Sequence, residues 1–347
     1  MIRKSWFSVA HVASASLLFI FAFGQLANSQ SVSYHFLKKV PLGAAPGGVE
    51  YFDYLFADLN ARRVYVSHGT EVKVVDANSG DVVGTITGLK KCHGIAVPDD
   101  SQRGFVTDGK EGKVFVFDVK TLKITGSIKT ADDSDAIIYE PASKRIFAFN
   151  GDSQSASVID PANATLVKTI QLGGGPEFAV ADGRGTVFNN IEDKSELVAI
   201  DSQTLTIKAR WPVAPAGTPT ALAMDREHRR LFSAGRKPQM VVMLDADTGK
   251  VLQSVPISAG ADAAIFEDAT GLLFVSTREG IVHIFHEDSP TKLSEVAILK
   301  TEYGAKTMAL DPKTHNLYLS TVEFGPASSD GERVAKPGTF HLLIYSR

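Results

Sequence analysis

The chain contains a single cysteine, Cys92, in 347 residues, and this scarcity limits how the protein can be stabilised. No disulfide can form within the chain, and a metal site built from paired cysteines is excluded. We therefore expect stability to come from packing and not from covalent cross-links.

A large excess of charge is also lacking, because 36 Lys and Arg face 39 Asp and Glu, which gives a formal net charge of −3. The sequence has no run of basic residues either. Nucleic-acid binders usually carry a clustered basic surplus that neutralises phosphates, so nucleic acid is not an expected partner. The 44% of hydrophobic residues and 22% of charged residues are typical of a soluble globular protein.

Common enzyme motifs are missing as well. The sequence contains no phosphate-binding glycine loop, no G-x-S-x-G and no H-E-x-x-H. The glycine run at 173–175 is better explained as a connection between structural units. Sequence motifs alone therefore assign no catalytic residue.

The one long apolar run lies at the N-terminus, where Arg3 and Lys4 precede an apolar stretch from Val9 to Phe23. This pattern predicts a signal peptide over residues 1–29, with cleavage after about residue 24 or 29, where small residues precede the cut. An uncleaved anchor is the alternative, although the run barely reaches the length of a membrane span. Cleavage would leave a single domain over 30–347, without a membrane span, in the periplasm or outside the cell.

A repeat of about 42 residues runs through the rest of the chain. Strand-like runs end in an acidic turn residue at spacings of 42, 42, 41 and 44, and these residues are Asp76, Asp118, Asp160, Asp201 and Asp245. His286 and Tyr345 continue the series and make seven units. Each aspartate is expected to accept backbone N–H groups in a hairpin turn, with Gly80 or Gly249 at positive φ, so a structural role is favoured over a catalytic one.

Each unit contains four short runs of alternating apolar residues, and no stretch of useful length has helical periodicity. The fold class is therefore predicted as all-β, a seven-bladed β-propeller of four-stranded blades. The last unit stops after its third strand, at Arg347, whereas residues 34–42 form an unassigned strand before the first unit. We expect this N-terminal strand to complete the last blade and close the ring.

The sequence resembles the YVTN-repeat, or YncE-like, β-propeller family across essentially the whole mature chain. Imperfect copies of the tetrapeptide YVTN, after which the family is named, begin at Tyr65, Phe105, Phe147, Phe188, Phe232, Phe274 and Tyr318. The resemblance implies an exported propeller. It implies no fixed chemistry, because the motif is structural and the family is functionally heterogeneous.

The repeat register places one residue from each blade at the start of the innermost strand, where the seven would ring one mouth of the central channel. These candidate ligand-binding residues are Asp53, His93, Asp135, Glu177, Thr220, Asp262 and Lys306. Asp53, His93, Asp135 and Glu177 come from successive blades and could together bind a divalent cation. The alternatives are a solvated ring in which Lys306 pairs with an aspartate, and an organic or anionic ligand.

Loops between the second and third strands should open at the same mouth, and each of their polar residues is expected to be solvated. They contribute His68, Asp108, Asn150, Asn190, Arg236, Arg278 and Glu323. The long final spacing predicts an insertion over about 324–339 in blade seven. It is interpreted as a lid over the mouth, a disordered excursion or a docking surface.

Cys92 precedes His93, and a thiolate beside an imidazole would make a reactive pair. Neighbours in a strand point to opposite faces, so Cys92 is expected to be a buried, inert thiol that points away from the channel.

Three functional hypotheses remain. The first is a non-catalytic, monomeric propeller that binds a small ligand, a metal ion or a protein at the channel mouth. The second is a metal-dependent hydrolase or lactonase that uses the His and carboxylate cluster. The third is an interaction scaffold without a pocket ligand. The sequence establishes no cofactor, and a divalent metal ion is the one candidate.

Overall fold

The computed structural model describes residues 1, 2, 4, 5, 32–46, 48, 50–99, 101–329 and 331–347. Residues Val32–Arg347 form one compact unit. The predicted signal peptide over 1–29 and its two cleavage points lie outside the described residues, apart from residues 1, 2, 4 and 5. Within the described part of the chain, no helix is long and apolar enough to cross a membrane.

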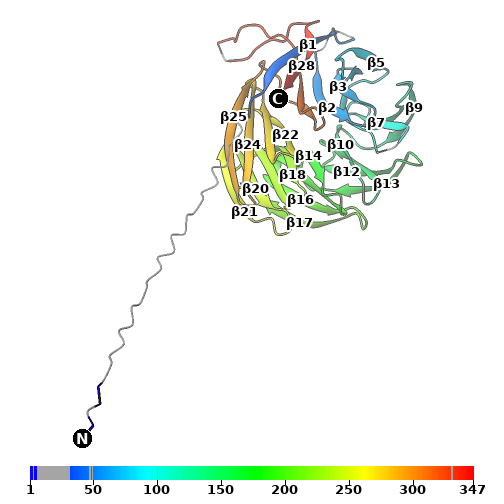
Figure 1. Cartoon of the computed structure of the whole chain (residues 1–347). Coiled ribbons are helices and arrows are strands. Elements are labelled where there is room, and N and C mark those ends of the chain that lie inside the picture. Colours follow the sequence, from blue (N-terminus) through cyan, green and yellow to red (C-terminus); the bar gives the residue numbers. More distant parts are fainter. Residues whose placement is uncertain (3, 6–31, 47, 49, 100, 330) are drawn as a thin grey trace. The chain divides into compact units, whose positions relative to one another are not determined.

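The predicted seven-bladed β-propeller is confirmed, because the strands form seven separate four-stranded antiparallel sheets (Figure 1). The first three blades consist of β2 (Phe52–Asp58), β3 (Arg63–His68), β4 (Glu71–Asp76) and β5 (Val82–Ile86); β6 (Cys92–Ala96), β7 (Arg103–Asp108), β8 (Lys113–Asp118) and β9 (Ile124–Lys129); and β10 (Ser134–Glu140), β11 (Arg145–Asn150), β12 (Ser155–Asp160) and β13 (Thr165–Gln171).

Blades four to six repeat this order. They consist of β14 (Pro176–Ala181), β15 (Thr186–Ile191), β16 (Glu196–Asp201) and β17 (Thr206–Pro212), with the short 3-10 helix η1 (Glu192–Lys194) between β15 and β16; β18 (Pro219–Asp225), β19 (Arg230–Arg236), β20 (Gln239–Asp245) and β21 (Val251–Pro256); and β22 (Ala261–Glu267), β23 (Leu272–Thr277), β24 (Ile281–Ser289) and β25 (Lys292–Lys300).

The seventh blade is assembled from both ends of the propeller, as predicted. Its strands are β26 (Met308–Asp311), β27 (Asn316–Thr321), β28 (Phe340–Ser346) and β1 (His35–Gly43). β1 pairs antiparallel with β28, from His35 opposite Ser346 to Gly43 opposite Phe340, and the two strands lie side by side in Figure 1. This pairing joins the start of the chain to its end and closes the ring.

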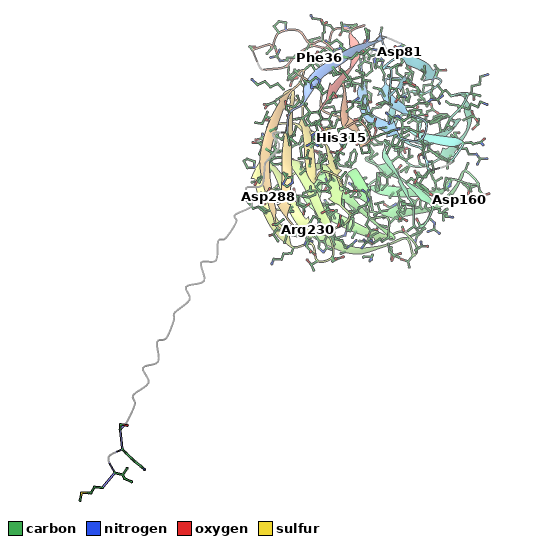
Figure 2. The ribbon with its side chains drawn as sticks, viewed as in Figure 1. Phe36, Asp81, Asp160, Arg230, Asp288 and His315 are labelled. Carbon is green, nitrogen blue, oxygen red and sulfur yellow. The ribbon has the colours of Figure 1, made fainter. Side chains whose placement is uncertain are left out.

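Aspartates at the ends of the third strands hold the outer hairpins. Asp76 Oδ1 accepts the backbone N–H groups of Asn78 at 2.9 Å and Ser79 at 2.8 Å, and Gly80 follows at φ +72°. Asp118, Asp201 and Asp245 accept N–H groups two and three residues later in the same way. Asp160 does so too and lies at the rim of the ring in Figure 2. These residues therefore have a structural role.

The core lies between neighbouring blades. The second strand of every blade begins its tetrapeptide with a buried aromatic side chain, and these are Tyr65, Phe105, Phe147, Phe188, Phe232, Phe274 and Tyr318. Between blades three and four, for example, Phe147 and Val158 pack in one cluster with Val187 and Val198. Large rings at one repeated position fill the space between sheets, which explains why the repeat retains an aromatic residue there.

We predict that shortening one side chain of β1 will show how much ring closure contributes to stability. Leu42 is 5% exposed and packs with Val64 and Val66 of blade one, so Leu42→Ala should lower the free energy of unfolding by about 2–5 kcal/mol. Leu37 lies in the same strand but is 54% exposed, and Leu37→Ala should change the free energy of unfolding by less than about 0.5 kcal/mol. Urea unfolding measures both. Equal effects of the two changes would contradict closure through β1.

Candidate functional site

The innermost strands of the seven blades contact one another in sequence around the channel. Six of the predicted mouth residues occupy the second position of these strands, and Lys306 lies two residues before β26. The six are Asp53, His93, Asp135, Glu177, Thr220 and Asp262. The seven positions are therefore equivalent in the fold, and the chain brings all of them to the same end of the channel.

Side chains of neighbouring blades hold the backbone of these mouth positions in place. Thr307 Oγ1 of blade seven donates a hydrogen bond to the Asp53 carbonyl at 2.6 Å. Thr107 Oγ1 of blade two donates to the Asp135 carbonyl. Thr220 donates to the Ala261 carbonyl at 2.7 Å, so its hydroxyl is used within the fold. Buried hydroxyls with fixed partners make the mouth a rigid frame.

Two carboxylates converge on one imidazole nitrogen at one side of the mouth. His93 Nδ1 lies 2.8 Å from Asp53 Oδ2 and 2.9 Å from Asp135 Oδ1. The Tyr51 hydroxyl lies 2.8 Å from the same nitrogen and donates to Asp53 Oδ2 at 3.0 Å. His93 is buried, and its Nε2 has no hydrogen-bond partner among the residues that the structure describes. We name these four residues the histidine cluster.

Burial and charge set the protonation of the histidine cluster. Burial favours neutral imidazole, but the hydrogen bonds and charges of Asp135 and Asp53 outweigh it and raise the pKa of His93 to about 10. Burial also disfavours the Asp53 carboxylate, yet the bond to His93 and the charge of Lys306 lower the pKa of Asp53. Burial, together with the charges of Asp53 and Asp133, raises the pKa of Asp135 despite the bond to His93. The geometry is thus that of a buried imidazolium shared by two carboxyl groups.

The other side of the mouth is rich in cations. Asp262 accepts hydrogen bonds from both Arg236 and Lys306, and these bonds link blades five, six and seven. Burial lowers the pKa of each cation, but the Asp262 charge outweighs it, so the pKa values of Arg236 and Lys306 are raised. Two cations therefore share one carboxylate.

Glu177 lies apart from both groups. Its pKa is raised well above its usual range, first by burial and then by the charges of Asp135, Glu192 and Asp262. Two groups of described residues could hold a metal ion: one contains Asp53, His93 and Asp135 without Glu177, and the other, away from the mouth, contains Asp225, His228 and Glu287.

The cationic side opens into a pocket of about 580 Å³, which we name the mouth pocket. It is lined by Glu50, Tyr51, Phe52, Arg236, Gly260, Arg278, Gly304, Lys306, Phe324 and Ala335. Phe324 and Ala335 belong to the blade-seven insertion and form an isolated bridge with each other. A Cβ at residue 304 would lie 2.5 Å from the Phe324 ring, so Gly304 allows the insertion to approach the mouth.

Contacts anchor the insertion at the rim of this pocket. The Gly338 N–H donates to Glu50 Oε1 at 2.7 Å, and Lys336 pairs with Glu323 at 3.2 Å. The Arg333 guanidinium lies 4.9 Å from the centre of the Tyr303 ring. The insertion over 324–339 therefore contributes wall residues to the mouth pocket.

Four loop residues that were expected to be solvated are instead fully buried, and that prediction was wrong. His68 bonds Glu50 at 2.7 Å and stacks on Phe340. Asp108 accepts the N–H groups of Lys90 and Lys91, whereas the Asn150 and Asn190 amides bond to Ser155 and Ala221. These residues lie at the ends of second strands, where an unpaired polar group would be costly, and each has at least one internal hydrogen-bond partner. Of the other loop residues, Arg236 and Arg278 line the pocket and Glu323 is exposed.

Cys92 is fully buried in the cluster between blades one and two, as predicted. Burial raises the pKa of its thiol to about 12, which leaves little thiolate at neutral pH. It packs with Val72, Val106 and Phe117, away from the channel, and no reactive pair with His93 exists.

Tyr51 and Glu50 are site residues that the repeat register did not identify. Tyr51 lies two residues before Asp53, so strand alternation places both side chains on one face, and this signal was available in the sequence. Glu50 had no such signal, because its role depends on the blade-seven insertion.

The chain is similar to known proteins chiefly in its fold. The family model described as Domain of unknown function (DUF5074) matches residues 93–211, from β6 to β17. No curated protein matches the sequence. The solved structure titled "Kuenenia stuttgartiensis Hydrazine Synthase" is similar, with a TM-score of 0.69 and 14% identity over 84% of this chain and 97% of that chain. At this identity the likeness supports the fold alone.

We predict a pH-dependent contribution of His93 to stability in buffer that contains EDTA. Because its pKa in the folded protein is raised to about 10, the stabilisation should be complete below pH 6.5 and disappear as the pH rises through 10. Urea unfolding should therefore show His93→Gln to be less stable than wild type by about 3 kcal/mol at pH 6, with a smaller difference at pH 10.

The control is His286→Gln, which alters an exposed histidine and aspartate pair on the outer hairpin of blade six. Its effect should stay within about 0.5 kcal/mol at every pH. A His93→Gln difference that is constant between pH 6 and pH 10 would contradict the shared imidazolium.

Proposed function

We propose that this protein is an exported, non-catalytic β-propeller of the YVTN-repeat type that binds a small, anionic, ring-containing molecule in the mouth pocket. Export rests on the N-terminal signal pattern, and the family on the tetrapeptide copies, which all lie in the second strands of the blades. The observation that carries the ligand class is the uneven charge of the pocket.

Three cations line the mouth pocket, and they are Arg236, Arg278 and Lys306. Arg236 shares Asp262 with Lys306 and also pairs with Glu192 at 3.4 Å, while no carboxylate among the described residues pairs with Arg278. The other acidic group in the lining, Glu50, is used by His68 and the Gly338 N–H. Arg278 is therefore the cation that is free to bind an anion, and a guanidinium is well suited to a carboxylate or phosphate in bidentate geometry.

Aromatic side chains favour a ring in the ligand. Tyr51 and Phe52 line one part of the mouth pocket and Phe324 lines another. The pocket volume of about 580 Å³ is within the usual range for sites of small organic molecules. An aromatic or cyclic carboxylate would satisfy the charge and the apolar walls together.

A divalent cation at the histidine cluster is the second candidate, and with it a metal-dependent hydrolase or lactonase. It is favoured by ligand atoms of Asp53, His93 and Asp135 that all lie within 4.8 Å of one another. These donor types fit such an ion, which would polarise a carbonyl group or activate water. The His93 Nε2 weakens this candidate. A metal-bound imidazole usually donates its second N–H to an acceptor, and the described part of the chain offers none to this nitrogen.

An interaction scaffold without a pocket ligand is the third hypothesis. No cluster of the described residues argues for it specifically. A protein that binds neither carboxylates nor a metal ion would favour this scaffold hypothesis.

We predict that aromatic carboxylates will raise the melting temperature of the mature protein. Benzoate and phthalate are suitable first probes, with binding measured by thermal shift and titration calorimetry. Loss of one charge-assisted contact in Arg278→Gln should weaken binding of the stabilising carboxylate by about tenfold or more.

The matched control is Arg184→Gln. Arg184 is also exposed and has no ion pair among the described residues, but it lies beyond β14 at the other end of the channel. Its replacement should leave affinity unchanged. The anion proposal fails if no carboxylate stabilises wild type, or if both substitutions weaken binding equally.

The metal hypothesis predicts near-stoichiometric metal in mature protein purified without chelator, and a lower melting temperature after EDTA treatment. Both effects should vanish in Asp135→Asn, which removes one ligand oxygen while keeping the shape of the side chain. Elemental analysis with thermal melting measures this. We expect no bound metal and identical melts with and without EDTA, because the imidazolium already offsets carboxylate charge in the cluster and occupies its His93 Nδ1 with a proton.

A further inference from the structure

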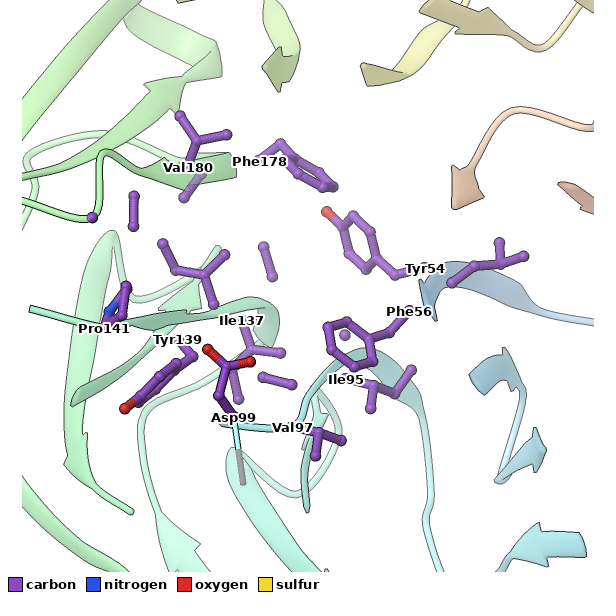
Figure 3. A pocket seen from close by; sticks show the side chains of 18 of the residues that line it. Tyr54, Phe56, Ile95, Val97, Asp99, Ile137, Tyr139, Pro141, Phe178 and Val180 are labelled. Atoms are coloured by element: carbon purple, nitrogen blue, oxygen red, sulfur yellow. The ribbon is translucent and has the colours of Figure 1, made fainter. Parts of the chain in front are cut away.

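The channel contains a second site beyond the mouth, and its wall is apolar. A cavity of about 450 Å³ lies among the innermost strands of blades one to four, and we name it the channel chamber (Figure 3). Asp99, Pro141, Gly183 and Arg226 line its open end. These residues follow β6, β10, β14 and β18, so the chamber opens at the end of the channel opposite to the charged mouth.

The chamber arises from the sizes of the side chains that follow the mouth residues in the innermost strands. The residues that follow the seven mouth positions are small in five blades, and these are Gly94, Ala136, Ala221, Ala263 and Thr307. In blades one and four they are Tyr54 and Phe178, whose ring centres lie 5.4 Å apart. Figure 3 shows Tyr54 extending toward Phe178. The two rings meet across the channel below the charged mouth, and space remains beside the small residues of blades two and three.

Tight packing accounts for the small residue in blade two. A Cβ at residue 94 would lie 2.8 Å from Ile137 Cγ2 and 3.0 Å from the Asp135 carbonyl oxygen. Glycine is therefore required for blades two and three to approach each other here. No side chain from this position can fill the chamber.

The chamber wall defines the chemistry of an occupant. Phe56, Tyr139 and Phe178 line it together with Ile95 and Ile137, and the aromatic side chains are only partly buried. Contact between an apolar molecule and partly exposed aromatic rings inside a concave space is favourable, because it buries apolar surface. A charged molecule would be desolvated there without a buried counter-ion.

One polar group points into this region. The Tyr54 hydroxyl has no hydrogen-bond partner among the described residues, and burial, followed by the charges of Asp135 and Asp53, raises its pKa well above the usual range. It stays protonated and can donate or accept one hydrogen bond. An occupant with a single polar substituent would therefore find a partner at the closed end of the chamber.

We propose that the channel chamber binds an uncharged, apolar, ring-containing small molecule, which enters from the end of the propeller opposite to the charged mouth. This site is separate from the mouth pocket, with which it shares no lining residue. Its occupancy does not depend on the proposed function of the mouth.

The test uses N-phenyl-1-naphthylamine, an uncharged probe whose fluorescence increases in apolar surroundings. The mature wild-type protein should bind one probe molecule per chain. Ala136→Leu places a larger side chain in the chamber and should weaken binding by about tenfold or more. Circular dichroism verifies that the variant remains folded.

Ala136 is buried, and a larger side chain there could unfold the protein, so the test includes a second variant at a less buried position. Val97 is partly exposed near the open end of the chamber, and Val97→Trp should reduce binding in the same way. Ile298→Ser removes an exposed apolar side chain from the outer strand β25 and should leave binding unchanged. The proposal is overturned if wild type does not bind the probe, if the folded chamber variants bind normally, or if Ile298→Ser abolishes binding.

Discussion

Closure of the ring is the constraint on which the rest of the structure depends. Four strands cannot bury both faces of a blade, so each blade requires a neighbour on either side, and the last blade requires a strand from the start of the chain. Pairing of β1 with β28 supplies it. Once the ring is closed, the seven innermost strands have fixed neighbours. Hydrogen bonds such as Thr307 to the Asp53 carbonyl then hold the mouth residues across blade boundaries.

The closed ring gives the channel one charged end and one apolar end. At the mouth, an imidazolium offsets carboxylate charge on the Asp53 and Asp135 side, whereas the other side carries Arg278, which pairs with no carboxylate among the described residues. Below the mouth, the Tyr54 and Phe178 rings meet, and the wall beyond them is apolar. Repetition of one backbone register thus produces both a polar and an apolar site, because successive positions in the same strands carry different side chains.

The repeat made the fold predictable from the sequence. The spacing of turn aspartates such as Asp76 gave the number of blades, and alternation placed Cys92 away from the channel. Contacts between distant side chains were not predictable in this way. His68 and Asp108 lie in apparent loops, yet the hydrogen bonds that bury them come from other segments. Tyr54 and Phe178 belong to blades that are not sequential neighbours, so the repeat period does not predict the contact between their rings.

The central claim is that the mouth pocket binds an anion while a proton on His93, and not a metal ion, holds the two carboxyl groups of the histidine cluster together. A crystal structure of the mature protein, purified without chelator and soaked with 4-bromobenzoate, tests it most directly through anomalous scattering. The account predicts a bromine peak in the mouth pocket, with the carboxylate at Arg278 or Lys306, and no metal peak at His93. A metal peak between Asp53 and Asp135, with no bromine in the pocket, would contradict it.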